Sequence, residues 1–206
     1  MTGRECPEVL VVETGTANLA SVLAALERAG ARPQTTTSAA EIERAGAVVL
    51  PGVGAFRAAM DRLRAAGLTG PLAARVRDGR SLLAICLGMQ LLAESSDESP
   101  GVAGLGVVTG HLRRFDAAVR VPQLGWNRVE PQPGCRLIEP GSAYFANSYV
   151  VDAVPDGWSA AASEHGGRFV SALERGPVLA CQFHPELSGA WGHALISRWL
   201  HRSVSC

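Results

Sequence analysis

The chain has 206 residues, of which 47% are hydrophobic and 18% are charged, a balance typical of a globular protein with a sizeable core. Nineteen basic residues balance nineteen acidic ones without a run of like charge, so nothing in the composition indicates a nucleic acid or an anionic membrane as a partner. The apolar stretch Val9–Val12 is too short for a signal-peptide core or a membrane-spanning helix, and we therefore expect a cytoplasmic protein.

The first half of the chain alternates between short apolar runs and helical patterns. The predicted core strands are Glu8–Glu13, Ala47–Leu50 and Ser81–Ile85. The predicted helices are residues 17–30, a short helix with a capping-box signature at Ser38 and Glu41, Phe56–Ala66, Pro71–Asp78, and a helix starting over Met89–Ala93. This alternation indicates a mostly parallel central sheet with helices on both faces, whose strands end at one ligand-binding rim.

The second half changes character from about Gly101 to Glu174, where Gly, Pro and Asp separate short alternating segments. Such a pattern is typical of antiparallel strands, and the predicted ones are Trp126–Glu130, Ala143–Val151 and Phe169–Glu174. The next predicted element is a core strand over Val178–Phe183, and the last one is a helix over Gly189–His201. No repeat or linker divides the chain, so we expect residues 1–206 to form a single domain.

The cysteines are scattered, odd in number and without a CxxC pair, so we expect neither a zinc site nor a disulfide framework. Cys86 differs from the others because it ends a predicted core strand and precedes a glycine-containing turn and a helix. This is the arrangement of a nucleophile elbow, in which the turn presents the sulfur and the helix N-terminus favours the reactive thiolate.

A cysteine nucleophile needs a base and an orienting group, and the segment Gln182–Glu186 contains both. His184 ends another predicted core strand, hence lies on the same rim as Cys86, and Glu186 can bind its second ring nitrogen. Alone, a cysteine in an apolar run is usually a core residue and an HPE turn is usually only a turn. Together, at strand ends on one rim, they indicate a catalytic triad.

The segments AICLGMQ around Cys86 and QFHPE around His184 closely resemble the two signatures of class I, triad-type glutamine amidotransferases. Further stretches are similar to the glutaminase subunit of imidazole glycerol phosphate synthase, namely ETGTANLASV, LPGVGAF, CLGMQLL, VPQLGWN, YFANSY and QFHPELSG. They follow the order of that family over nearly the whole chain. The resemblance implies the α/β class I glutamine amidotransferase fold, which is flavodoxin-like, and no cofactor or metal.

The resemblance implies that Cys86 attacks the side-chain amide of glutamine, that His184 shuttles the proton, and that Glu186 orients His184. A thioester would form, and ammonia and glutamate would leave. The implied oxyanion hole consists of Leu87, Gly52 and Val53, although a plain glycine turn is the alternative for the last two. The implied glutamine-binding residues are Gly54, Gln90, Glu98, Asn147, Ser148 and Tyr149.

The partner in this family is a (β/α)8-barrel cyclase, expected to form a heterodimer with the glutaminase and to use its ammonia. The cyclase makes imidazole glycerol phosphate and an aminoimidazole carboxamide ribotide in histidine biosynthesis. The positions that match the segments facing this partner are Asn18, Gln123, Gly125, Trp126, Tyr144 and Leu187. For Trp126 the alternative is a place in the core.

Four positions depart from the family pattern: Ala84 replaces glycine, Gln123 and Asn147 replace histidines, and Leu187 replaces a lysine or arginine. No triad member is lost. Because Gln123 and Leu187 concern the partner surface, a paralogous subunit that feeds a different barrel stays an alternative. Two further alternatives are a stand-alone cysteine hydrolase and a non-catalytic scaffolding subunit.

Overall fold

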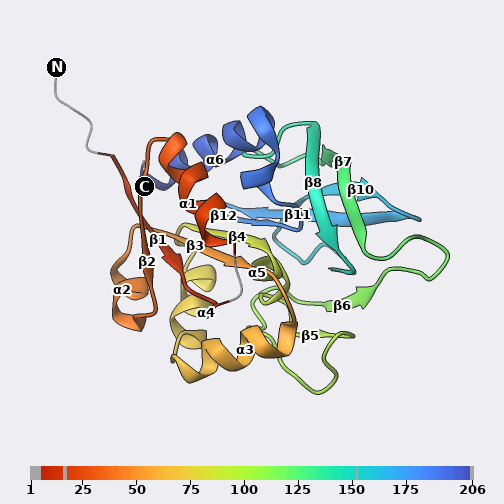
Figure 1. The fold of residues 1–206 in the computed structure, drawn as a ribbon, viewed down its shortest axis with the longest axis horizontal. Coiled ribbons are helices and arrows are strands. Elements are labelled where there is room, and N and C mark those ends of the chain that lie inside the picture. The colour runs from red at the N-terminus through yellow and green to blue at the C-terminus, as the bar shows by residue number, and fades with distance from the viewer. Residues whose placement is uncertain (1–5, 16–17, 152, 205–206) are drawn as a thin grey trace.

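The computed structural model describes residues 6–15, 18–151 and 153–204. Five parallel strands form one half of its sheet, in the spatial order β2 (Arg32–Thr36), β1 (Glu8–Val12), β3 (Ala47–Gly52), β4 (Leu82–Cys86) and β12 (Val178–Cys181) (Figure 1). Counted along the chain as parallel strands, this order is 2-1-3-4-5, the flavodoxin-like arrangement. The predicted mostly parallel α/β sheet is therefore confirmed.

Helices cover both faces of the parallel strands (Figure 1). On one face lie α1 (Leu19–Arg28) and α6 (Gly189–Val204), and on the other lie α2 (Ala39–Arg44), α3 (Phe56–Ala65) and α4 (Thr69–Arg77). Successive strand residues point to opposite faces, so Val9 and Val11 share a core with α1 and α6, whereas Leu10 packs with α3. Both faces of these strands are buried, which explains why the strands are continuous apolar runs.

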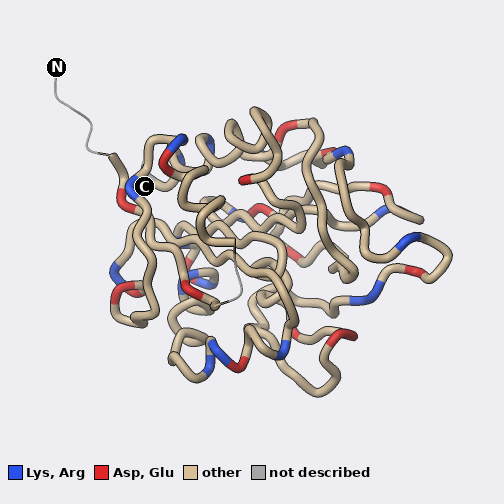
Figure 2. Tube along the Cα trace, viewed as in Figure 1, with Lys and Arg blue, Asp and Glu red and all other residues tan. Residues whose placement is uncertain are grey.

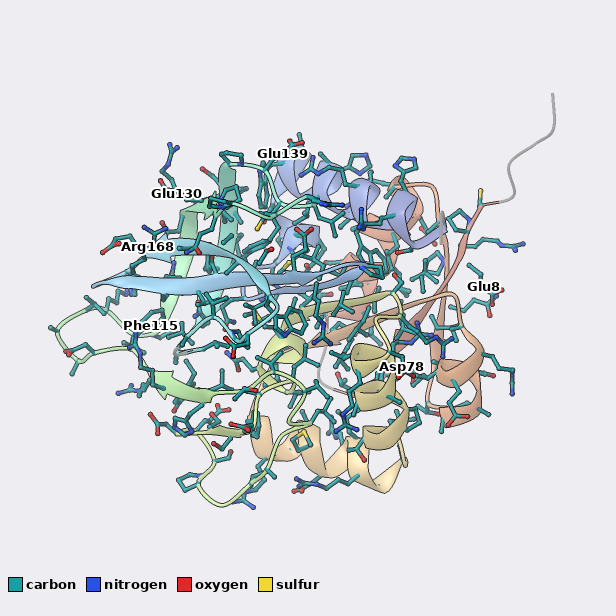
Figure 3. The ribbon with its side chains drawn as sticks, turned by 180° about the vertical axis from the view of Figure 1, so that it is seen from behind. Glu8, Asp78, Phe115, Glu130, Glu139 and Arg168 are labelled. Carbon is teal, nitrogen blue, oxygen red and sulfur yellow. The ribbon has the colours of Figure 1, made fainter. Side chains whose placement is uncertain are left out.

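The other half of the sheet is antiparallel, as expected. It continues from β12 through β11 (Arg168–Arg175), β10 (Ser159–Glu164), β7 (Gln123–Pro131) and β8 (Gly141–Asn147). A smaller branch consists of β9 (Tyr149–Val151), β6 (His111–Arg114) and β5 (Ser95–Ser96), in which β6 is antiparallel to β9 but parallel to β5. Phe115 is buried beside this branch, edge-on to Phe169 at a ring distance of 5.2 Å, whereas the charged residues labelled in Figure 3 are exposed.

Two predicted elements differ from the structure. The strand predicted over Ala143–Val151 is two strands, because β8 pairs with β7 whereas β9 pairs with β6 and β11, and the Ser148 carbonyl between them accepts a hydrogen bond from Phe115 N–H at 3.0 Å. The helix predicted from Met89–Ala93 is wrong in position and length. Helix α5 spans only Leu87–Gln90, because the carbonyls of the following residues accept hydrogen bonds from the loop at residues 105–108.

Charges of both signs are interspersed over the surface, and neither sign gathers on one side (Figure 2). Within the described ranges, no helix is long and apolar enough to span a membrane. The prediction for residue 17, at the start of the first helix, lies outside the described residues. The feature of the fold that matters for function is the shared rim, where β3, β4 and β12 end next to the β8–β9 connection.

Candidate active site

Cys86 occupies a sharp turn between β4 and α5. Its backbone has φ 53° and ψ −109°, and it is the only non-glycine residue with positive φ in the described part of the chain. Such a conformation is unfavourable by about 1–3 kcal/mol and persists only where the surroundings enforce it. The turn places the sulfur at the end of a core strand, as a nucleophile elbow requires.

Two glycines allow the elbow to pack closely against β3. A Cβ on Gly88 would lie 1.9 Å from the Leu50 carbonyl oxygen, and one on Gly52 would lie 3.0 Å from Leu87 Cβ. Gly52 is also the residue of β3 directly opposite Cys86. Ala84, where the family pattern has glycine, is fully buried in the middle of β4, with Leu50 and Ala180 beside it in the neighbouring strands.

His184 follows β12, the strand next to β4, and is fixed on both sides. Its N–H donates to the Tyr144 carbonyl at 2.9 Å, and its carbonyl accepts from Ser188 Oγ at 2.6 Å. Its ring Nδ1 lies 2.8 Å from Glu186 Oε1, and the two side chains are only 8% and 3% exposed. The single turn of 3₁₀ helix η1 (Pro185–Leu187) brings Glu186 back onto the imidazole.

The electrostatics of His184 favour its charged form. Burial by itself would lower the pKa of His184, but hydrogen bonds and charge interactions with Cys86 and Glu186 outweigh burial and raise the pKa to about 10. The raised pKa favours the imidazolium form at neutral pH, which can stabilise a thiolate at Cys86 and later give up a proton.

Besides His184, the side chain of Gln182 interacts with the sulfur, although no sequence motif assigns it a role. Gln182 Nε2 donates to Cys86 Sγ at 3.7 Å, and Gln182 Oε1 accepts from Gln90 Nε2 at 3.0 Å. The sequence carries a signal for this contact: Gln182 is a polar residue inside an apolar run, two positions before His184 and hence on the same face of the strand.

A cavity of about 230 Å³ opens over the sulfur. Its lining residues are Val53, Gly54, Cys86, Leu87, Gln90, Glu98, Ala146, Asn147, Ser148, Tyr149 and His184. Apart from Ala146, the sequence predicts every one of them as a catalytic, oxyanion or glutamine-binding residue. The rim thus brings together segments that are more than a hundred residues apart in the chain, such as Val53 and His184.

Glu98 both lines this cavity and holds the neighbouring helix. Its Oε2 accepts the N–H of Phe56, the first residue of α3, at 2.7 Å. Helix α3 begins directly after the Gly52–Gly54 strip, where Gly54 has φ 96°. Glu98 is therefore held by a backbone N–H and is not a freely solvated surface carboxylate.

Next to the cavity lies an exposed apolar area, which we call the docking face and define by Leu124, Trp126, Tyr144 and Leu187. Trp126 is 60% exposed, so its alternative place in the core is wrong, and it meets the half-buried Tyr144 edge-on at 6.3 Å. Leu124 and Leu187 are 63% and 42% exposed. Gly125, half-buried, lies between Leu124 and Trp126, and the exposed Asn18 precedes α1, which contacts η1.

Gln123 does not lie on this surface, in contrast to the expectation. Its side chain is 5% exposed because neighbouring strand residues point to opposite faces, and Leu124 takes the outer one. It sits directly opposite Asn147 in the β7–β8 ladder. Oε1 of Gln123 and Oδ1 of Asn147 are both buried without a hydrogen-bond partner.

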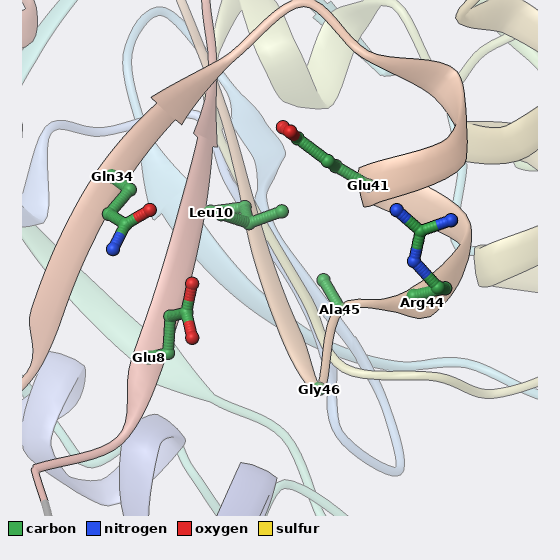
Figure 4. A pocket seen from close by; sticks show the side chains of 7 residues that line it. All are labelled: Glu8, Leu10, Gln34, Glu41, Arg44, Ala45 and Gly46. Atoms are coloured by element: carbon green, nitrogen blue, oxygen red, sulfur yellow. The ribbon is translucent and has the colours of Figure 1, made fainter.

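Another cavity, of about 330 Å³, lies toward the amino ends of the strands and carries no nucleophile (Figure 4). Its lining residues are Glu8, Leu10, Gln34, Glu41, Arg44, Ala45 and Gly46. Among residues 6–15, 18–151 and 153–204, no three His, Cys, Asp or Glu side chains cluster in a way that could hold a metal ion. The reactive groups of the described chain therefore meet at Cys86.

Comparison with known proteins agrees with this geometry. The family model of glutamine amidotransferase class-I matches residues 10–202. The chain is 44% identical to the imidazole glycerol phosphate synthase subunit HisH of Deinococcus radiodurans over 202 residues, covering 95% of this chain and 94% of that protein. It is 40% identical to subunit HisH of Bacillus velezensis over 198 residues, covering 92% and 93%.

Solved structures support the fold. A crystal structure of a glutamine amidotransferase superposes with a TM-score of 0.76 at 22% identity, covering 95% of this chain and 98% of that one. The structure of PurLQS from Thermotoga maritima contains a chain that superposes with a TM-score of 0.71 at 16% identity, covering 97% of this chain and 99% of that one.

Proposed function

We propose a mechanism and a partner for this chain, which belongs to the class I glutamine amidotransferases and, among them, to the HisH subunits of imidazole glycerol phosphate synthase. Its activity is that of the glutamine amidotransferase subunit of this enzyme of histidine biosynthesis. The observation that carries the mechanism is the arrangement of Cys86, His184 and Glu186, with the sulfur at the elbow and the imidazole held 2.8 Å from the carboxylate.

In the first half of the reaction the Cys86 thiolate attacks the side-chain carbonyl carbon of glutamine. The backbone N–H of Leu87 and the Gly52–Val53 strip stabilise the negative oxygen that develops. The imidazolium of His184 donates its proton to the departing nitrogen, so that ammonia leaves and a thioester remains on Cys86. Glu186 stabilises the imidazolium form of His184 until the proton is transferred.

In the second half the neutral His184 takes a proton from water, and the resulting hydroxide attacks the thioester carbon. The C–S bond breaks, glutamate leaves, and the thiolate–imidazolium pair is restored. The cavity supplies polar groups for the rest of the substrate. The carboxylate of Glu98 suits the ammonium group, and the buried Asn147 Oδ1 has an acceptor position for a substrate N–H.

The docking face supports a partner that takes the ammonia. Exposed large apolar side chains are unusual in a cluster. Here Leu124 and Trp126 lie on β7, which pairs with the cavity-lining end of β8, and Leu187 follows His184 by three residues. We propose that a (β/α)8-barrel cyclase subunit binds at this face, with Trp126 as its main anchor. Ammonia released at Cys86 would then pass directly to the bound cyclase.

The test is to measure glutamate release from glutamine by the purified chain alone and with candidate barrel cyclases that carry their nucleotide substrate. We expect slow release alone, faster release with the histidine-pathway cyclase, and none from Cys86→Ser. Activation only by a barrel from another pathway would establish the paralogue. Glutamate release by Cys86→Ser at the wild-type rate would overturn the mechanism.

A further inference from the structure

The side chain of Gln182 is fully buried at the end of β12, between the sulfur of Cys86 and the amide of Gln90. It is absent from the cavity lining and therefore lies behind the surface that a substrate in the cavity would meet. Its backbone N–H donates to the Ser171 carbonyl at 2.9 Å, which fixes the residue in the sheet. A buried amide with no access to the substrate, in direct contact with the nucleophile, has a role that packing alone does not explain.

The hydrogen bonds determine which way the Gln182 amide faces. Gln90 Nε2 donates to the Tyr149 backbone carbonyl at 3.2 Å, and a carbonyl can only accept, so this end of Gln90 is its nitrogen. The same nitrogen lies 3.0 Å from Gln182, which must therefore present its oxygen there. The nitrogen of Gln182 is then left to face Cys86 Sγ.

The sulfur consequently has two kinds of neighbour. The Ala146 carbonyl, 3.9 Å away, can only accept and therefore suits a protonated thiol. Gln182 and His184 donate, and so both suit a thiolate. The two donors differ in one respect: His184 gives up its proton during the reaction, whereas an amide keeps its N–H throughout.

We propose that Gln182 is a positioning residue that holds the Cys86 sulfur as a thiolate and aims it, with Gln90 fixing the direction of its donor. The inference deepens the proposed function and rests on it. When His184 has transferred its proton to ammonia, Gln182 remains the donor next to the sulfur. It can thus favour the thiolate as leaving group when the thioester is hydrolysed, without taking part in any proton transfer.

The test is the rate at which iodoacetamide alkylates Cys86, measured as a function of pH by mass spectrometry of the peptide that contains Cys86. A hydrogen bond to a charged group is stronger than one to a neutral group, so its loss disfavours the thiolate. For Gln182→Met we therefore expect the midpoint of the pH profile to rise by about one pH unit or more. We also expect kcat for glutamine to fall about tenfold or more, with KM little changed. Gln34→Met, which replaces an exposed glutamine of β2, should keep the wild-type profile.

A Gln182→Met protein with wild-type thermal unfolding and an unchanged alkylation profile would overturn the proposal. If this variant does not fold, the side-chain amide protons of Gln182 can be followed by NMR in the wild-type chain. They should shift as Cys86 titrates, whereas independence of that titration would contradict the proposal. The alkylation profile and the NMR shift do not use glutamine. If the wild-type protein proved inactive on glutamine, the proposed function would fail while these two readouts would still test the contact between Gln182 and Cys86.

Discussion

At the scale of single residues, the site depends on how a few neighbouring groups shift the pKa of His184. The interaction with Cys86 raises the pKa of His184, and so does Glu186, whose nearly buried Oε1 accepts from the imidazolium. His184 also carries a folding contribution. Its pKa is raised from 6.5 to about 10, so the stabilisation by its partners is complete below about pH 6.5 and is lost as the pH rises through about 10.

Replacement of Glu186 by Gln should lower the pKa of His184 from about 10, because the neutral amide no longer stabilises the imidazolium. NMR titration of the His184 ring from pH 5 to 11 checks this. The free energy of unfolding should also decline less in the variant than in the wild type between pH 6.5 and 10. An unchanged titration midpoint would contradict the assignment of Glu186 as the orienting carboxylate.

Gly88 offers a second test at this scale. A Cβ at this position would meet the Leu50 carbonyl oxygen at 1.9 Å, so Gly88→Ala must move either α5 or β3 and should be severely destabilising. Gly70 in α4 is a matched control, because a Cβ there has no neighbour within 4 Å and alanine favours a helix by about 1 kcal/mol. Urea unfolding of both variants measures the difference. Equal stability of the two variants would show that the elbow does not require the close approach of Gly88 to the Leu50 carbonyl.

At the scale of elements, apolar runs predicted the strands that are buried on both faces, and they predicted little else. β1, β3, β4 and β12 have the expected places, but the edge strand β2, with the sequence RPQTT, has no apolar pattern to reveal it. The capping prediction at Ser38 is confirmed, since its side chain accepts from Glu41 N–H at 3.4 Å. The carboxylate of Glu41 binds the Thr36 hydroxyl instead of Ser38 N–H, which donates to Thr36 Oγ1.

Strand β7 shows why the site was only partly predictable. Its apolar residues Leu124 and Trp126 face outward, whereas the polar Gln123 faces inward, the reverse of the usual pattern. Sequence alone places a residue on a strand, but not on a face when the exposed side is the apolar one. The pairing of Gln123 with Asn147 could not be predicted either, because it depends on the register between β7 and β8.

Because these two departures from the family pattern face each other, we expect them to be energetically coupled. Gln123→His, Asn147→His and the double variant form a thermodynamic cycle whose free energies of unfolding can be measured with urea. Residues in direct contact typically couple by at least about 0.5 kcal/mol, and the double variant should be less destabilised than the sum of the single ones. Additive effects would show that the two substitutions are independent.

At the scale of the whole molecule, the topology explains how distant segments form one site. Parallel strands β3, β4 and β12 carry the Gly52 strip, Cys86 and His184 to a common edge, and the antiparallel half adds Asn147 through Tyr149 and the docking face. The fold class follows from the alternation of apolar runs and helical patterns, whereas almost the whole cavity lining is implied by the family resemblance. The single-domain organisation stays a prediction, as does the barrel partner.

The docking face makes a prediction at this scale. Trp126→Ala should weaken binding of the cyclase at least tenfold, about 1.4 kcal/mol, with little change in thermal stability because the side chain is 60% exposed. Val154→Ala, an exposed apolar residue outside the docking face, is the control and should bind normally. Isothermal titration of both variants with the cyclase measures this. Normal binding by Trp126→Ala would place the interface elsewhere.

The central claim is that Cys86 is the nucleophile for glutamine. The most direct measurement is to incubate the wild-type chain and its cyclase with a glutamine-analogue electrophile and to locate the covalent adduct by peptide mass spectrometry. We predict one adduct, on Cys86, which excess glutamine suppresses and which His184→Asn slows. An unmodified Cys86 in a complex that still hydrolyses glutamine, or an adduct on another cysteine such as Cys135 that tracks the loss of activity, would contradict the account.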